Sequence, residues 1–214
     1  GGDFPQIILH QDRLSKPLHW RKPRRVFVNS MSDLFHKDVP ASFILDCFEV
    51  MAACYSQHTF QILTKRPERV ESVLYGSEGN YYLGGGDWYP NIRLGFSAED
   101  QGSLDKRWAA FLRRPSERIA WSFAIPLWVS LEPLLGPIVL PASAAGSLTW
   151  VVVGGESGLH HRRCEVSWIA DIVAQCREAR IPCFVKQDSH RLPGQQGRIP
   201  DKLWAVKEYP QERR

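Results

Sequence analysis

The stretch Trp150-Val-Val-Val-Gly-Gly-Glu-Ser-Gly158 decides how the chain folds. Its first half is a run of β-branched residues, which is typical of a strand that is buried on both faces. The run ends in two glycines, and a carboxylate and a hydroxyl group follow. An apolar strand with a polar tip is how a parallel α/β sheet presents a site at its carboxyl edge. A tight turn from strand to helix would give the same local sequence, so the segment alone leaves both interpretations open.

The same pattern recurs along the chain. Helical periodicity separates most of the short apolar runs that predict the other strands, at residues 26–28, 59–63, 92–96, 127–129 and 183–185. A (β/α) repeat of this kind gives a parallel sheet, either doubly wound or closed as a barrel. We expect about six parallel strands with helices outside, in a single domain over residues 1–214.

Three segments depart from the repeat. Residues 1–25 contain several prolines and are expected to form an irregular entry segment. Residues 75–90 are rich in glycine and tyrosine, which predicts a loop insertion at the surface. Residues 188–214 form a C-terminal tail, in which the short run 203–206 is expected to dock back on the body of the domain.

Composition narrows the class of protein. The chain has 214 residues, of which 43% are hydrophobic, so it can bury a sizeable core. No apolar run approaches the ~20 residues that a membrane span needs, and no secretory signal is visible. The five cysteines form no Cys-x-x-Cys pair, so we expect reduced core residues in a cytoplasmic protein. The formal charge of +4 permits an anionic partner without requiring one.

The polar tips of the six predicted strands converge on one edge of the sheet, where they form a candidate site. Basic tips suit a phosphate or carboxylate, and glycine amides can add to such a site. Acidic tips can accept from an amine or a ribose hydroxyl, or act as acid and base. The alternative is an ion-pair lattice that fills the barrel mouth. The candidates for binding a small anionic or nucleotide-like ligand are Asn29, Ser30, Ser32, Asp33, Thr64, Lys65, Arg66, Ser97, Glu99, Ser130, Glu132, Gly154, Gly155, Glu156, Ser157, Lys186 and Gln187.

These residues do not by themselves indicate metal binding or a catalytic mechanism. No histidines stand at metal-ligand spacing, so no metal site is predicted. No nucleophile and base can be paired by spacing, so the catalytic residues of a metal-independent hydrolase or lyase stay open. The basic segment Arg21–Arg25 and the aromatic residues Tyr81, Tyr82, Trp88 and Tyr89 could contact nucleic acid by charge and stacking.

Five segments together carry a family resemblance. The chain from about Leu9 to Pro210 resembles the phage gene-product thirty-seven/sixty-eight family, uncharacterised proteins of phages and bacteria. The resemblance implies a cysteine cluster just upstream, similar to the loop of radical S-adenosylmethionine enzymes, in which three thiolates hold a [4Fe–4S] cluster and leave one iron open for the cofactor. The core of those enzymes is a full or partial (β/α) barrel, so the resemblance implies that this chain folds as an incomplete (β/α) TIM-type barrel of about six strands. The segments are Phe27-Val-Asn-Ser-Met-Ser-Asp-Leu-Phe35, Phe60-Gln-Ile-Leu-Thr-Lys-Arg66, Val129-Ser-Leu-Glu-Pro-Leu-Leu-Gly-Pro137, Val153-Gly-Gly-Glu-Ser-Gly158 and Val185-Lys-Gln187.

The sequence departs from that family at its start. No cysteine triplet lies between Gly1 and Asn29, so the chain as given is not expected to hold the cluster. The [4Fe–4S] cluster and S-adenosylmethionine are expected only in an intact form. Two functions stay open: a radical S-adenosylmethionine-like barrel that binds a small anionic or nucleotide-like ligand, and a non-catalytic nucleic-acid-binding module of phage origin.

Overall fold

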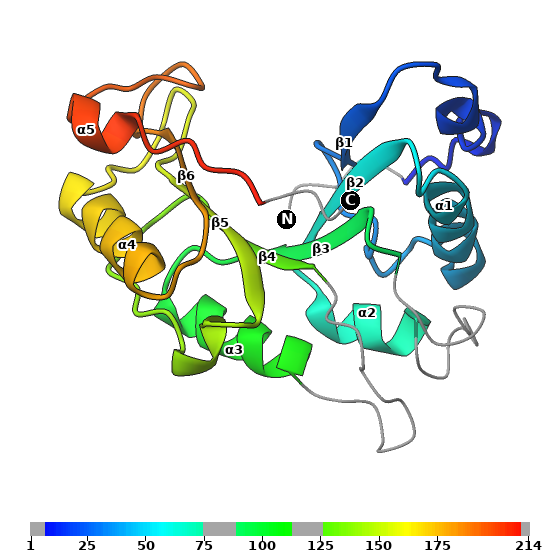
Figure 1. Ribbon diagram of the computed structural model, residues 1–214, viewed down its shortest axis with the longest axis horizontal. Helices are drawn as coiled ribbons and strands as arrows, with labels where there is room; N and C mark the ends of the chain where they lie inside the picture. The colour runs from blue at the N-terminus through cyan, green and yellow to red at the C-terminus, as the bar shows by residue number, and fades with distance from the viewer. Residues whose placement is uncertain (1–6, 75–88, 113–125, 211–214) are drawn as a thin grey trace.

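The computed structural model describes residues 7–74, 89–112 and 126–210, which form one curled, six-stranded sheet with helices on its convex side (Figure 1). Every strand is parallel to its neighbours, and the strands lie side by side in the order of the chain. This confirms the expected incomplete (β/α) barrel. The strands are β1 (Arg24–Val28), β2 (His58–Thr64), β3 (Ile92–Ser97), β4 (Leu127–Leu131), β5 (Leu148–Gly154) and β6 (Cys183–Gln187).

The predicted helices lie between these strands. Apolar residues at helical spacing explain them: Ile44, Phe48 and Met51 share the buried face of the first one. The entry segment is less irregular than expected, because two short 3-10 helices, η1 (Gln11–Arg13) and η2 (Lys16–His19), occupy it, and another, η3 (Ala142–Ala144), precedes β5. The α-helices are α1 (Ala41–Ala53), α2 (Pro67–Leu74), α3 (Gln101–Leu112), α4 (Val166–Glu178) and the short α5 (Asp201–Trp204).

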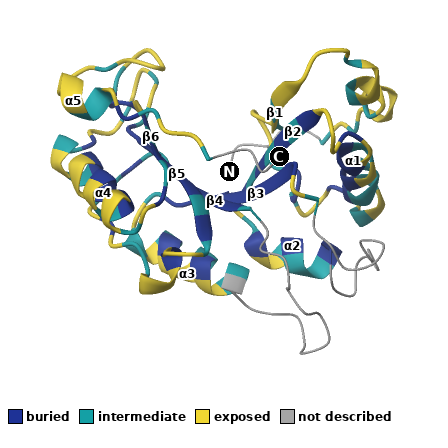
Figure 2. Cartoon of the chain, viewed as in Figure 1, coloured by how far each residue is buried: buried dark blue, intermediate teal, exposed yellow. Residues whose placement is uncertain are grey.

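The core lies between the sheet and the helices (Figure 2). Alternate residues of each strand face it: Phe60 and Ile62 of β2 are buried there, whereas Gln61 and Leu63, which alternate with them, are only half-buried. One buried cluster joins β2 and β3 to α1 and α2, and a second joins β3 to β6 with α3 and α4. The polar strand ends therefore stand on a rigid, well-packed base.

Aromatic rings cover the concave side of the sheet. The ring centroids of Trp128 and Trp150 are 5.3 Å apart, and those of Phe27 and Trp128 are 6.1 Å apart. The Trp128 indole lies against Gly95 of the neighbouring strand, where a Cβ atom would come within 2.4 Å of it. Glycine is therefore required at this position. These rings form an aromatic layer, which consists of Phe27, Trp128, Trp150, Phe184 and Tyr209.

The tail docks back on the body, as predicted. The amide of Val185 in β6 donates to the carbonyl of Val206 at 2.9 Å, and Phe184 forms an antiparallel bridge with Lys207. Tyr209 then packs on Phe184 and lies under the guanidinium of Arg25 in β1, 4.6 Å from its ring centroid. The tail thus links the last strand to the first.

The predicted insertion, the cysteines and Tyr89 can be compared with the expectations from the sequence. Most of the predicted insertion lies outside the described residues, since only its last two residues, 89 and 90, are described. All five cysteines are free thiols; four are buried, but Cys47 is only half-buried. Tyr89 is also half-buried against the core, so it does not offer the exposed ring expected of it. Among the described residues, no helix is long and apolar enough to cross a membrane.

Candidate ligand-binding site

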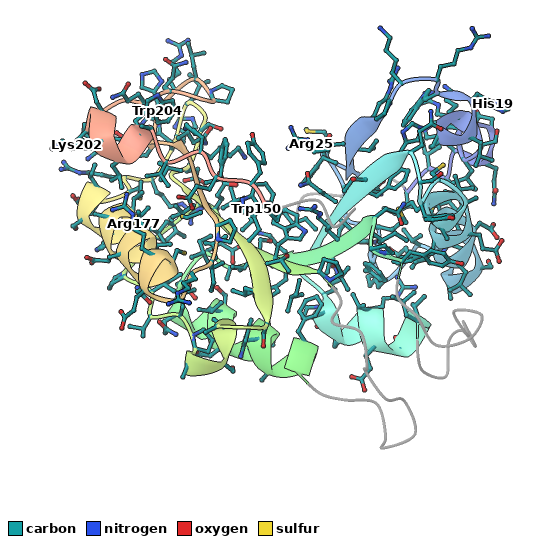
Figure 3. All side chains as sticks on the ribbon, viewed as in Figure 1. His19, Arg25, Trp150, Arg177, Lys202 and Trp204 are labelled. Atoms are coloured by element: carbon teal, nitrogen blue, oxygen red, sulfur yellow. The ribbon has the colours of Figure 1, made fainter. Side chains whose placement is uncertain are left out.

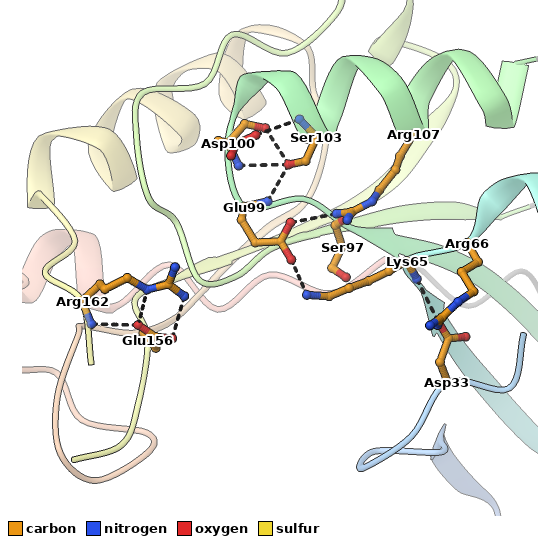
Figure 4. A network of polar contacts seen from close by, with 10 residues as sticks. All are labelled: Asp33, Lys65, Arg66, Ser97, Glu99, Asp100, Ser103, Arg107, Glu156 and Arg162. Carbon is orange, nitrogen blue, oxygen red and sulfur yellow. Dashed lines mark hydrogen bonds and ion pairs between the residues drawn. The ribbon is translucent and has the colours of Figure 1, made fainter. Parts of the chain in front are cut away.

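Glu99 is the centre of the polar network at the carboxyl edge (Figure 4). Its side chain is 16% exposed and accepts from the Lys65 ammonium and, at 2.8 Å, from Nη1 of Arg107. The same Arg107 nitrogen donates to the carbonyl of Ser97 at 2.6 Å. Burial raises the pKa of Glu99, but the hydrogen bonds from Lys65 and Arg107 outweigh it and hold that pKa below its ordinary value. Glu99 is therefore a fixed anion at neutral pH and not a proton donor.

The start of α3 fixes the position of Glu99. Asp100 accepts from the Ser103 amide at 2.7 Å, and the Ser103 hydroxyl accepts from the amides of Glu99 and Asp100 at 2.9 and 3.1 Å. Polar side chains that satisfy free amides in this way are typical of helix starts. The backbone that carries the Glu99 carboxylate is thus held by the helix itself.

A groove of about 670 Å³ opens beside this network, between the starts of α2 and α3. Three cationic side chains line it, and Lys106 among them forms no ion pair within the described part of the chain. The positive end of the α3 dipole adds to their field. The volume is in the range of small-molecule sites. The lining residues are Lys65, Pro67, Glu68, Asp100, Gly102, Ser103, Lys106, Arg107 and Ala110.

Three other predicted residues pair with each other. Asp33 accepts from the Thr64 hydroxyl at 2.8 Å, from Nη1 of Arg66 at 2.7 Å and from the Lys65 amide at 3.2 Å. These bonds tie the loop after β1 to the end of β2. Asn29 adopts φ 56° in that loop, and Ser30 and Ser32 are exposed. Arg66 is therefore committed to Asp33, and Lys65 is the basic tip that faces the groove.

Glu132 and Lys186 form a second pair, further along the edge. The Ser130 hydroxyl donates to Oε2 of Glu132 at 3.0 Å, and the Lys186 ammonium lies 3.2 Å from both carboxylate oxygens. Only its contact with Oε2 has hydrogen-bond geometry, so Oε1 is a buried oxygen without a hydrogen-bond partner in the described structure. This pair spans β4 and β6 and closes that side of the edge.

The glycine turn after β5 approaches the chain's own backbone. A Cβ atom on Gly155 would lie 2.3 Å from the Ser189 nitrogen, and the Gly155 amide donates to the carbonyl of Gln187 at 2.9 Å. The expected use of this amide for an anion is therefore wrong, because β5 and β6 come together there. The Gln187 side chain donates to the Gly155 carbonyl and accepts from the Gly194 amide, so it also holds the end of β5 against the segment after β6.

Glu156 at the tip of β5 is paired with Arg162. The carboxylate accepts from Nε and Nη2 of Arg162 at 2.8 and 2.7 Å and from its amide at 2.7 Å. These bonds lower the pKa of Glu156 to about 2. Neither Glu156 nor Glu99 is thus poised to act as an acid near neutral pH, and the two carboxylates serve as acceptors. Ser157 forms a bridge with His190 beside this pair.

The structure brings four further charged residues to the edge that the strand tips did not indicate. Arg107 and Arg162 come from a helix and a loop, and only the folded chain brings them to Glu99 and Glu156. Asp188 directly follows β6, is 1% exposed and binds the guanidinium of Arg198 at 2.7 and 3.0 Å. Asp188 directly follows Gln187, so extending the predicted tip of β6 by one residue would have included it. Arg198 lies in a loop, and no sequence pattern there predicts its contact with Asp188.

Comparison with known proteins identifies a family without an assigned activity. No curated protein and no solved structure matches the chain. The chain belongs to the family described as "Protein of unknown function (DUF5131)", which matches residues 3–203.

Proposed function

We propose that the chain binds a small, phosphate- or carboxylate-bearing ligand of nucleotide-like size in the groove between α2 and α3. The observation that carries this proposal is the convergence of Lys65, Lys106 and Arg107 on one groove of about 670 Å³. Ammonium and guanidinium groups are the usual partners of phosphate and carboxylate oxygens.

The charges around the groove favour a ligand with both an anionic group and hydroxyl or amino groups. Glu99 neutralises part of the Lys65 and Arg107 charge, while Lys106 is exposed and free of ion pairs among the described residues. Glu68 and Asp100 stand on the same lining and can accept from ribose hydroxyls or an amine. A nucleotide carries both kinds of group.

The residues of this chain do not fit the iron–sulfur cluster that the family resemblance implies. Such a cluster needs thiolates grouped around one point. Burial raises the pKa of Cys164 and of Cys47 to about 12, and no group of three cysteine, histidine or acidic ligands occurs in the described residues. No step of the proposed function is therefore routed through a cluster, and S-adenosylmethionine is treated as one nucleotide-like candidate.

Calorimetric titration with adenosine 5′-monophosphate tests the proposal. Replacing Lys65 and Lys106 together by alanine should raise Kd by about 100-fold or more, since each lost hydrogen bond to a charged group contributes about 1.5–3 kcal/mol. The thermal midpoint should change little, because both side chains are exposed to solvent. Adenosine, which lacks the phosphate, should bind more weakly, and S-adenosylmethionine tests the carboxylate alternative.

The matched control replaces Arg177 of α4 and Lys202 of α5, exposed cations that do not line the groove (Figure 3). That variant should bind adenosine 5′-monophosphate like the unmodified chain. Equal Kd values for the two double variants, or adenosine binding as tightly as its monophosphate, would show that the groove cations do not hold the ligand.

A further inference from the structure

A second concentration of positive charge lies away from the groove, on the entry segment and β1. Among residues 7–25 the only acidic residue is Asp12, and it contacts Arg13 at 3.8 Å. The basic strip, as it is called below, consists of side chains that are all exposed: Arg13, Lys16, Arg21, Lys22, Arg24 and Arg25.

Most of the basic strip is unneutralised. Within the described residues, Lys16, Arg21 and Lys22 form no ion pair. Helix α1 packs against η2 and carries Asp46 and Glu49, but neither carboxylate is paired with the strip in that part of the chain. So much unpaired charge of one sign favours a polyanionic partner.

Aromatic rings accompany these cations. The guanidinium of Arg24 lies 4.6 Å from the ring centroid of Trp20, and that of Arg25 lies at the same distance from Tyr209. Beyond them, Phe27 is 43% exposed and Tyr209 is 47% exposed on the concave side of the sheet. Cations that follow a phosphate backbone next to rings that stack on bases are the usual equipment for binding single strands.

We propose that the basic strip, together with Phe27 and Tyr209, docks single-stranded nucleic acid. An anionic membrane would satisfy the charges, but a flat bilayer does not reach the two rings on the concave side, whereas a flexible strand does. The basic strip runs from η1 to β1 and shares no residue with the groove between α2 and α3. The two binding activities are therefore separable.

Fluorescence anisotropy with a labelled twenty-nucleotide oligothymidylate tests this surface. Replacing Lys16, Arg21 and Lys22 by alanine removes three exposed charges that form no ion pair with any described residue. At about 100 mM salt the affinity should fall at least about tenfold, and the slope of log K against log salt should decrease in magnitude by about 2, because each contact with a single strand contributes about 0.7. Binding of adenosine 5′-monophosphate should not change.

The control variant removes three exposed cations elsewhere, with R177A, R191A and K202A, and should lose less than about twofold in affinity. The substitution F27A should weaken oligothymidylate binding by about tenfold through lost stacking and leave a duplex of the same length unaffected. Equal loss in both triple variants would overturn the assignment. So would binding to phosphatidylserine vesicles without binding to the oligonucleotide, or an equal affinity for the single strand and the duplex.

Discussion

Two arginine–carboxylate pairs at the carboxyl edge differ in how far water reaches them. Asp188 is almost completely buried, and its oxygens accept from Arg198 and from the Ser189 amide. Burial raises the pKa of Asp188, but these hydrogen bonds outweigh burial and hold that pKa below its ordinary value. Glu156 has similar partners at the surface, where solvent screens them. The first pair should therefore stabilise the fold and the second should contribute little.

Replacing Asp188 by asparagine should lower the free energy of unfolding by about 2–3 kcal/mol, below the full range for a buried pair because Arg198 is 41% exposed. E156Q should cost less than about 1 kcal/mol. Since the folded pKa of Asp188 is depressed, its contribution is present above pH ~4 and is lost as the pH falls through the folded pKa. Urea unfolding between pH 7 and pH 3 measures both effects. Similar losses in the two variants at pH 7 would contradict this assignment.

At the residue scale, the sequence indicated the functional groups of the edge but not their pairing. Lys65, Glu99, Glu132 and Lys186 were expected there because they follow predicted strands. Which cation meets which carboxylate depends on the curl of the sheet, and Arg107 reaches Glu99 from a helix. The alternative of an ion-pair lattice thus describes part of the edge, while the groove beside α3 supplies the space for a ligand.

At the scale of an element, the double glycine lets the end of β5 approach the backbone that follows β6. The ladder between these strands changes register between Val153 and Gly154, and the backbone of Ser189 then passes over Gly155. Only a residue without a side chain fits under that backbone. The main role of Gly155 in the stretch Trp150–Gly158 is therefore to allow close packing against the backbone that follows β6.

The substitution G155A should therefore lower the free energy of unfolding by about 3 kcal/mol or more, because the added methyl group meets backbone that cannot move aside. G136A is the matched control: nothing lies within 4 Å of the added Cβ atom, and the change should stay within about 0.5 kcal/mol. Chemical denaturation of both variants measures the difference, and insolubility of G155A alone would agree with it. A G155A protein as stable as G136A would refute the close contact.

Elements were the most predictable level of the structure. The run of β-branched residues in β5 and the spacing of apolar residues in α1 each reflect local chemistry. The observed strand β5, Leu148–Gly154, begins two residues before the expected apolar run at Trp150. The 3-10 helices η1 and η2 were not expected, because three or four residues of helix leave no periodicity to detect.

At the scale of the whole molecule, the half-barrel is held by contacts between distant parts of the chain. The aromatic layer lines the concave side, and Tyr209 joins β6 to Arg25 of β1. The apolar run 203–206 predicted that the tail docks on the body. The contact between Tyr209 and Arg25 could not be predicted, because contacts between residues so far apart in the sequence leave no local pattern. The groove beside α3 shares no residue with this layer.

The central claim is that this groove is the ligand site, and anomalous diffraction tests it most directly. Crystals grown with 8-bromoadenosine 5′-monophosphate should show a bromine peak between the starts of α2 and α3, with the phosphate against Lys65, Lys106 and Arg107. A bromine peak on the aromatic layer or on the basic strip, or no peak under conditions where the nucleotide binds in solution, would contradict the claim.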